Sequence, residues 1–201
     1  MTKIKLCIFD MGGVLIRNFQ VKPMVEKFLT EQGIPQEKIH ETWKKLISLH
    51  GCGHIDEIEM WKRFSSETGT PPIDCSESIL GRFFKPTLDI PTVEILQKLK
   101  DCKMRLVCGT NVLDSHYRIH NELKQYDIFD KVYASHLMHV QKPAKEFYTE
   151  ICENENVLPQ EVFFTDDFQE NIDAARNVGI EAFLYTGAED LERQLHSLGI
   201  F

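Results

Sequence analysis

Short apolar segments alternate with helical segments through the second half of the chain, and this alternation limits the possible folds most strongly. Strands are predicted at residues 5–9, 105–108, 131–134, 161–165 and 182–185. Helices are predicted at residues 92–101, 112–123, 145–153, 171–178 and 190–198. Short, almost wholly apolar strands that are separated by helices are typical of a parallel sheet with both faces covered. The sequence therefore predicts an α/β protein with a Rossmann-like parallel sheet.

Between the first and second predicted strands, the pattern is helical only. Trp43 and Trp61 occur at positions that helical periodicity places on apolar faces, where they are expected to form a small core. Asp56 is a predicted N-cap, and Gly69 is predicted to end the same helix. We expect a core domain of residues 1–17 and 86–201, with a helical cap of residues 18–85 inserted after the first strand.

Composition excludes several classes of function. The net charge is −8 and the basic residues are scattered, which argues against nucleic acid as a partner. No apolar run approaches the roughly 18 residues of a membrane span, and no signal peptide is recognisable, so no membrane partner and a cytoplasmic location are expected. The six cysteines are expected to be free thiols.

Polar residues follow the ends of the predicted strands. Asp10 follows the first strand, Thr110 and Asn111 follow the second, and Asp166 and Asp167 follow the fourth. Lys142 lies in the long connection after the third strand. Ligands of open parallel sheets bind beyond the carboxyl ends of the strands, so these groups are predicted to gather at one edge of the sheet.

Four segments carry a resemblance to the haloacid dehalogenase superfamily. They are residues 8–15 (IFDMGGVL), 107–111 (VCGTN), 141–143 (QKP) and 162–167 (VFFTDD), in the order of the family's motifs. The pattern is most similar to the branch that resembles α-D-glucose-1-phosphate phosphatase. The resemblance implies a Mg²⁺-dependent phosphatase that forms an aspartyl-phosphate and acts on a small phosphorylated metabolite.

The resemblance also implies a role for individual residues. Asp10 is the expected nucleophile, and Thr110 and Lys142 are the expected catalytic partners that bind the phosphoryl oxygens. The implied Mg²⁺ ligands are Asp10, the Gly12 carbonyl, Asp167 and Asp166. Gly12, Gly13 and Asn111 are expected to bind the substrate, in loops that surround the phosphoryl group. These residue types suit the chemistry, because Mg²⁺ prefers oxygen ligands and a covalent step divides a slow hydrolysis in two.

The chain departs from the family at Gly12, where most members carry a second aspartate as general acid. Without that acid, either a substrate with a good leaving group is favoured or another group or water donates the proton. A sugar 1-phosphate meets the first requirement. Arg17 is a candidate for a substrate contact, and the alternative is a solvated hinge residue. His54 is a second candidate, and the alternative is an exposed loop histidine. His116 and His120 lie four apart on one helix and are interpreted as surface residues.

Two alternative functions are kept. A 2-haloacid dehalogenase would use the same nucleophile but no metal, and the acidic pair Asp166 and Asp167 argues against it. A non-catalytic binding or regulatory protein is the second alternative, and the retention of Asp10, Thr110 and Lys142 argues against decay of the site. The sequence does not indicate an oligomeric state.

Overall fold

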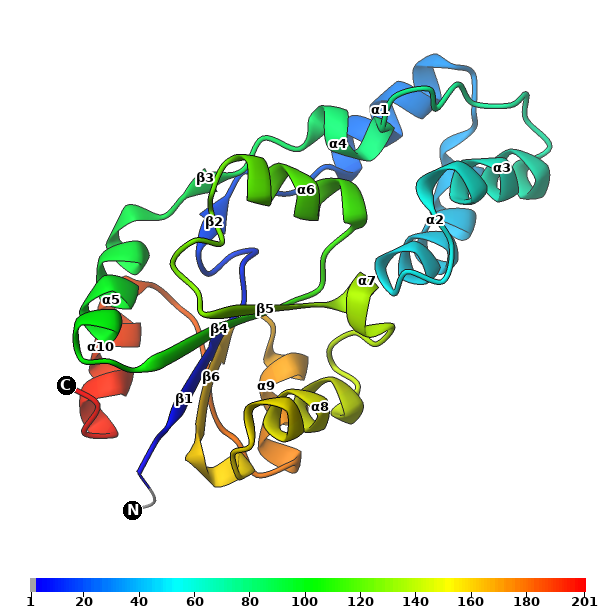
Figure 1. The fold of residues 1–201 in the computed structure, drawn as a ribbon. Helices are drawn as coiled ribbons and strands as arrows, with labels where there is room; N and C mark the ends of the chain where they lie inside the picture. Colours follow the sequence, from blue (N-terminus) through cyan, green and yellow to red (C-terminus); the bar gives the residue numbers. More distant parts are fainter. Residues whose placement is uncertain (1–2) are drawn as a thin grey trace.

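A five-stranded parallel sheet forms the centre of the protein. The computed structural model describes residues 3–201 (Figure 1). The strands run in the order β5-β4-β1-β6-β7, and every neighbouring pair is parallel. Their bounds are β1 (Leu6–Phe9), β4 (Arg105–Thr110), β5 (Lys131–Ala134), β6 (Val162–Asp166) and β7 (Glu181–Leu184). The predicted α/β class with a parallel sheet is confirmed.

Helices cover both faces of the sheet, as the almost wholly apolar strands require. One face carries α5 (Ile90–Asp101) and α10 (Ala188–Ser197), and the other carries α8 (Lys145–Glu155) and α9 (Gln169–Asn177) (Figure 1). Alternate residues of β1 serve the two faces: Cys7 and Phe9 pack into one buried cluster, Leu6 and Ile8 into the other. This two-residue period is the side-chain period of an extended strand.

The helical insertion begins and ends at a short antiparallel ribbon. Strand β2 (Ile16–Arg17) pairs with β3 (Thr87–Leu88). Between them lie α1 (Lys22–Glu31), α2 (Gln36–Gly51), α3 (Glu57–Thr68) and α4 (Ile79–Phe83), which we call the cap (Figure 1). Asp56 caps α3 as predicted, since its Oδ1 accepts a hydrogen bond from the Glu59 amide at 2.7 Å. The boundaries at residues 18 and 85 stay a prediction.

The cap does not have a hydrophobic core of its own. Leu29 and Trp61 of the cap belong to the same buried cluster as Cys7 and Phe9 of the sheet. Buried residues of the loop after β1, among them Met11, belong to this cluster too. Apolar contact is therefore continuous from one face of the sheet into the cap.

The prediction that His116 and His120 lie on the surface is wrong. Both are buried on α6 (Asp114–Glu122), which packs against α4 of the cap. The His116 ring stacks on Phe84, with ring centroids 3.8 Å apart. Burial lowers the pKa of His116 to about 4, so this ring is neutral and behaves as an aromatic core residue. The sequence pattern missed the cap surface that covers this side of α6.

Two further expectations concern the described part of the chain. All six cysteines are free thiols, as predicted. Among residues 3–201, no helix combines the length and the apolar character that crossing a bilayer requires. The start of β1 and the C-terminal end of α10 lie at the end of the core that is remote from the cap (Figure 1).

Candidate active site

The sheet order brings three of the predicted site residues together. Strand β1 lies between β4 and β6, so the residues at the carboxyl ends of these strands are neighbours. Asp10 follows β1, Thr110 is the last residue of β4, and Asp166 is the last residue of β6. The Asp10 amide donates to the Thr165 carbonyl at 3.1 Å, which extends the β1–β6 pairing to the nucleophile candidate. Asp10, Thr110 and Asp166 are all buried.

Lys142 reaches this edge from the connection between β5 and α8. Its Nζ donates to Asp10 Oδ1 at 2.6 Å, to Asp166 Oδ2 at 2.6 Å and to the Gly109 carbonyl at 2.8 Å. All three ammonium hydrogens are thereby used, and the side chain is only 3% exposed. Burial acts to lower the pKa of Lys142, but the charges of Asp10 and Asp166 raise it overall. Lys142 is therefore held as a buried cation between two carboxylates.

Two asparagines hold the charged residues in place. Asn111 accepts from the backbone amide of Lys142 and donates to the backbone carbonyl of Lys142, both at 2.9 Å. Asn171 donates to Asp166 Oδ1 at 2.9 Å, and the Phe168 amide donates to the same oxygen at 2.8 Å. Asn111 thus positions the lysine backbone, while its predicted contact with substrate stays a prediction.

Three carboxylates form a group that fits a cation. One oxygen from each of Asp10, Asp166 and Asp167 lies within 4.8 Å of the others, and among residues 3–201 no other His, Cys, Asp or Glu side chains form such a group. Asp167 Oδ1 is buried and has no hydrogen-bond partner among the described residues. One lysine cannot neutralise three clustered carboxylates, so a divalent cation would complete the site. An all-oxygen donor set matches the preference of Mg²⁺.

The same crowding perturbs the acid–base chemistry of the group. Burial raises the pKa of Asp10 to about 7, with further upward contributions from Asp166 and Asp167, against the opposing effect of Lys142. Burial and Asp166 also raise the pKa of Asp167. A bound cation would favour the ionised forms, which Asp10 requires in order to act as a nucleophile.

The loop after β1 needs glycine at position 13. Gly13 has φ +77°, and a Cβ at this position would collide with the carboxylate of Asp167. Only glycine adopts this conformation without strain and also permits the close approach of the backbone. The loop therefore lies directly against the proposed cation site. Coordination by the Gly12 carbonyl stays a prediction.

Phe19 is the residue near the site that the sequence did not indicate. A Cβ at Gly12 would meet the Phe19 ring at 3.1–3.2 Å. The aromatic ring therefore lies over the position from which a side chain at residue 12 would extend. No local pattern reveals this contact, because it depends on how the chain turns from β2 into the cap.

Arg17 is occupied by contacts within the protein. Its Nη1 donates to the carbonyls of Gly13, Val14 and Ile16 at 2.8–3.1 Å. Its Nη2 lies 3.4 Å from a carboxylate oxygen of Asp89. These contacts tie the loop after β1 to the ribbon, and the predicted substrate contact of Arg17 stays a prediction.

Two histidines of the cap differ in environment. His54 is exposed and stacks on His139 of the core, with centroids 6.0 Å apart. His50 is buried at the end of α2, and its Nδ1 lies 3.0 Å from the Ile55 carbonyl. The exposure of His54 agrees with the alternative of an exposed loop histidine, and its predicted substrate contact stays a prediction.

Thr110 has no side-chain hydrogen bond within the described part of the chain, which leaves its hydroxyl available to a ligand.

The chain is similar to known proteins in sequence and in fold. The chain is 27% identical to a sesquiterpene phosphatase of Aspergillus oryzae over 89% of this chain and 88% of that protein. It is 25% identical to a D-ribitol-5-phosphate phosphatase of Bacteroides thetaiotaomicron over 96% of this chain and 97% of that protein. A haloacid dehalogenase family enzyme of B. thetaiotaomicron, solved with magnesium and inorganic phosphate, superposes with a TM-score of 0.73 at 24% identity, covering 90% of this chain and 93% of that one.

The family profile described as haloacid dehalogenase-like hydrolase matches residues 4–179, which include every residue of the site described above. The chain therefore belongs to the haloacid dehalogenase-like hydrolase family.

Proposed function

We propose that the protein is a Mg²⁺-dependent phosphohydrolase that acts on a small phosphorylated metabolite, with a sugar phosphate as the substrate class. The observation that carries the proposal is the buried group of Asp10, Asp166, Asp167 and Lys142 at one edge of the sheet. Its negative charge calls for a cation, and its lysine fixes one oxygen of the residue that would attack. The two curated relatives described above, whose names state phosphatase activity, support the same reaction class.

The residues of the site suggest how the steps are divided. Lys142 holds Asp10 Oδ1, and the other carboxylate oxygen would attack phosphorus. The bond from phosphorus to the leaving oxygen breaks, and an aspartyl-phosphate forms on Asp10. Water then attacks the phosphorus of this intermediate and regenerates the carboxylate. Mg²⁺ when bound supplies charge stabilisation for the transferring phosphoryl group. The Thr110 hydroxyl is available to donate to a phosphoryl oxygen.

The leaving group must acquire a proton without help from residue 12. Gly12 offers no side chain, and the Phe19 ring lies where one would extend. A leaving group that is expelled readily without protonation is therefore favoured, and the anomeric oxygen of a sugar 1-phosphate is more acidic than an ordinary alcohol. The names of the two relatives describe phosphates of chemically different alcohols, so the relatives alone do not select the substrate.

Phosphate release from a panel of sugar phosphates and p-nitrophenyl phosphate, with Mg²⁺ and with EDTA, tests the proposal. Asp10→Asn should abolish phosphate release. Asp127→Asn, which changes an exposed aspartate that is not one of the site residues, should leave phosphate release unchanged. Release that persists in Asp10→Asn would refute the proposed nucleophile. Mg²⁺ binding without turnover of any substrate would favour a binding protein, and metal-independent release of halide from a 2-haloacid would favour the dehalogenase.

A further inference from the structure

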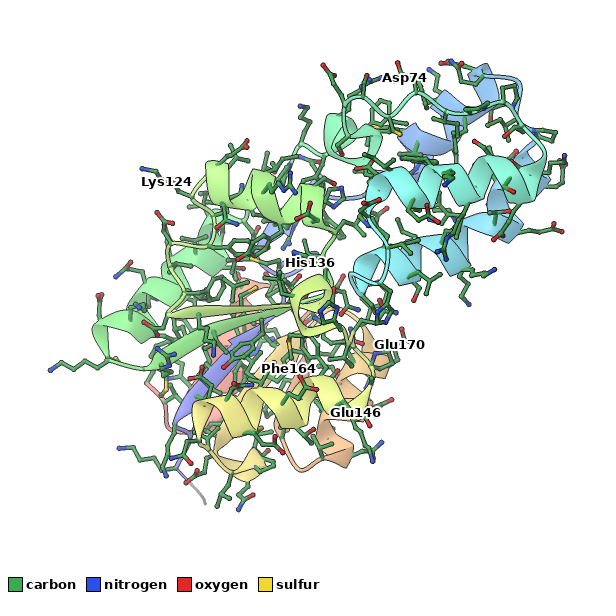
Figure 2. The ribbon with its side chains drawn as sticks, turned by 45° about the vertical axis from the view of Figure 1, so that its right-hand side comes forward. Asp74, Lys124, His136, Glu146, Phe164 and Glu170 are labelled. Atoms are coloured by element: carbon green, nitrogen blue, oxygen red, sulfur yellow. The ribbon has the colours of Figure 1, made fainter. Side chains whose placement is uncertain are left out.

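A cavity lined by histidine and carboxylate side chains lies where the cap meets the core, apart from the carboxylate group around Asp10. A cavity of about 210 Å³ is lined by His50 of α2, by Asp56 and Glu57 at the start of α3, and by two core residues. These are Asp114 of α6 and His136 of α7 (Ser135–Met138). Figure 2 labels His136 on α7, close to the end of α2.

The hydrogen bonds of the two histidines fix their tautomers. His50 Nδ1 lies 3.0 Å from the Ile55 carbonyl, and His136 Nδ1 lies 3.1 Å from the Val112 carbonyl. A carbonyl oxygen only accepts, so each Nδ1 carries the hydrogen and donates it. Each Nε2 is left with a free lone pair. This is the arrangement of metal-binding histidines, whose second ring nitrogen typically donates to a backbone carbonyl or a carboxylate.

Neither Nε2 atom has a partner. Both are buried and make no hydrogen bond within residues 3–201, although His50 is only 3% exposed and His136 only 7%. A buried nitrogen that is left unsatisfied costs free energy, so an unpartnered pair beside one cavity points to a ligand. Burial also lowers the pKa of His136, which keeps its ring neutral at pH 7.

The charges around the cavity favour a cation. Asp56, Glu57 and Asp114 lie on its walls, and none of its lining residues is a lysine or an arginine. Arg118, which does not line the cavity, pairs with Asp114 at 2.7 Å, so Asp56 and Glu57 supply the uncompensated negative charge. Imidazole nitrogens select borderline metals such as Zn²⁺, Ni²⁺ and Cu²⁺ over Mg²⁺. The site would therefore differ in metal preference from the all-oxygen group around Asp10.

We propose that this cavity binds a borderline divalent metal ion, with Zn²⁺ as the representative, through Nε2 of His50 and Nε2 of His136. The two histidines form no group of three with a carboxylate or thiol whose ligand atoms lie within 4.8 Å of one another, since the Asp10 group is the only such cluster among the described residues. Water completes the coordination. One histidine comes from the cap and the other from the core, so the ion links the two parts.

Zinc titration of the untagged full-length chain in excess Mg²⁺, followed by competition with a chromogenic chelator, tests the proposal. The Mg²⁺ keeps the oxygen site occupied, and the same titration in an Asp167→Asn background controls for zinc at that site. We expect one zinc per chain in both backgrounds. His50→Gln and His136→Gln should each weaken binding by at least about tenfold. His54→Gln, which changes an exposed histidine four residues after His50, should leave the zinc affinity unchanged.

Equal zinc affinity in the His50→Gln, His136→Gln and unsubstituted proteins would overturn the proposal, as would the loss of all zinc binding in the Asp167→Asn background. Because a buried histidine substitution can reduce folding, a second measurement uses the unsubstituted chain. Cu²⁺ electron paramagnetic resonance in excess Mg²⁺ should show coupling to two imidazole nitrogens. A spectrum with oxygen ligands only would overturn the proposal. Neither measurement depends on phosphatase activity, so the proposed function stands or fails separately.

Discussion

Lys142→Met is the substitution with the largest expected effect, because Lys142 pairs with two buried carboxylates. The change removes three hydrogen bonds of 2.6–2.8 Å and leaves Asp10 and Asp166 together without their cation. Removing one partner from a buried ion pair costs about 3–5 kcal/mol. We expect a decrease of this size in the free energy of unfolding at pH 7 without metal, together with loss of phosphate release.

The pH dependence of this loss is its signature. The pKa of Asp10 is raised to about 7 in the folded protein, against roughly 4 for an unfolded chain. The folded state therefore binds a proton that the unfolded state has released, and stability falls as pH rises from roughly 4 through the folded pKa. In the unsubstituted protein this fall levels off above pH 7, once Asp10 has lost its proton. Without Lys142 the pKa of Asp10 rises further, so the fall continues at higher pH.

The difference in free energy of unfolding between the unsubstituted protein and Lys142→Met should therefore grow by about 1.4 kcal/mol per pH unit above pH 7, or about 2 kcal/mol by pH 8.5. Urea denaturation in EDTA at pH 5.5, 7 and 8.5 measures it. Lys145→Met, which removes an exposed lysine at the start of α8, should change stability by no more than about 0.5 kcal/mol. A constant difference between pH 7 and 8.5, or a loss no larger than that of the control, would refute the reasoning.

Three further predictions follow from the site. Gly13→Ala should lower the free energy of unfolding, measured by urea denaturation, by at least about 2 kcal/mol more than Gly33→Ala does. Both glycines have positive φ, but only a Cβ at position 13 meets a carboxylate. Equal decreases in the two variants would contradict this. Mg²⁺ affinity, measured by calorimetry, should fall by about tenfold per pH unit below the pKa of Asp10, near 7, because the ion must displace a proton; a flat profile from pH 7 to 5.5 would exclude this competition. Gly12→Asp combined with Phe19→Ala should raise alkyl phosphate turnover relative to p-nitrophenyl phosphate by about 100-fold. Gly12→Asp alone should not do so, because the Phe19 ring obstructs it, and equal gains in both variants would contradict the role assigned to the ring.

The strands and their ends were predictable because the information is local. Apolar runs such as residues 6–9 stop abruptly at Asp10, and parallel strands present their ends at one edge. The order of the motifs then identified Lys142, although it lies 132 residues from its partner Asp10. The central position of β1, between β4 and β6, is what brings these separate segments into contact.

Contacts between the cap and the core could not be predicted in this way. The Phe19 ring lies over Gly12, and His116 is buried against Phe84, because of how the cap helices pack on the core. Helical periodicity in the sequence predicts which face of α6 is apolar. It does not predict which polar residues of α6 another element will cover. The two-residue strands β2 and β3 are too short to leave a periodic signal.

The continuous buried cluster has a consequence for how the molecule comes apart. Since Leu29 and Trp61 of the cap belong to the same buried cluster as Phe9 of the sheet, the cap cannot unfold without exposing apolar residues of that cluster to water. The insertion is thus part of one cooperative unit and not an appended module. Excising it would leave α5 and α10 on the sheet but would expose the apolar residues of the cluster that the cap covers, among them Met11 in the loop after β1, and such an exposed apolar patch promotes aggregation.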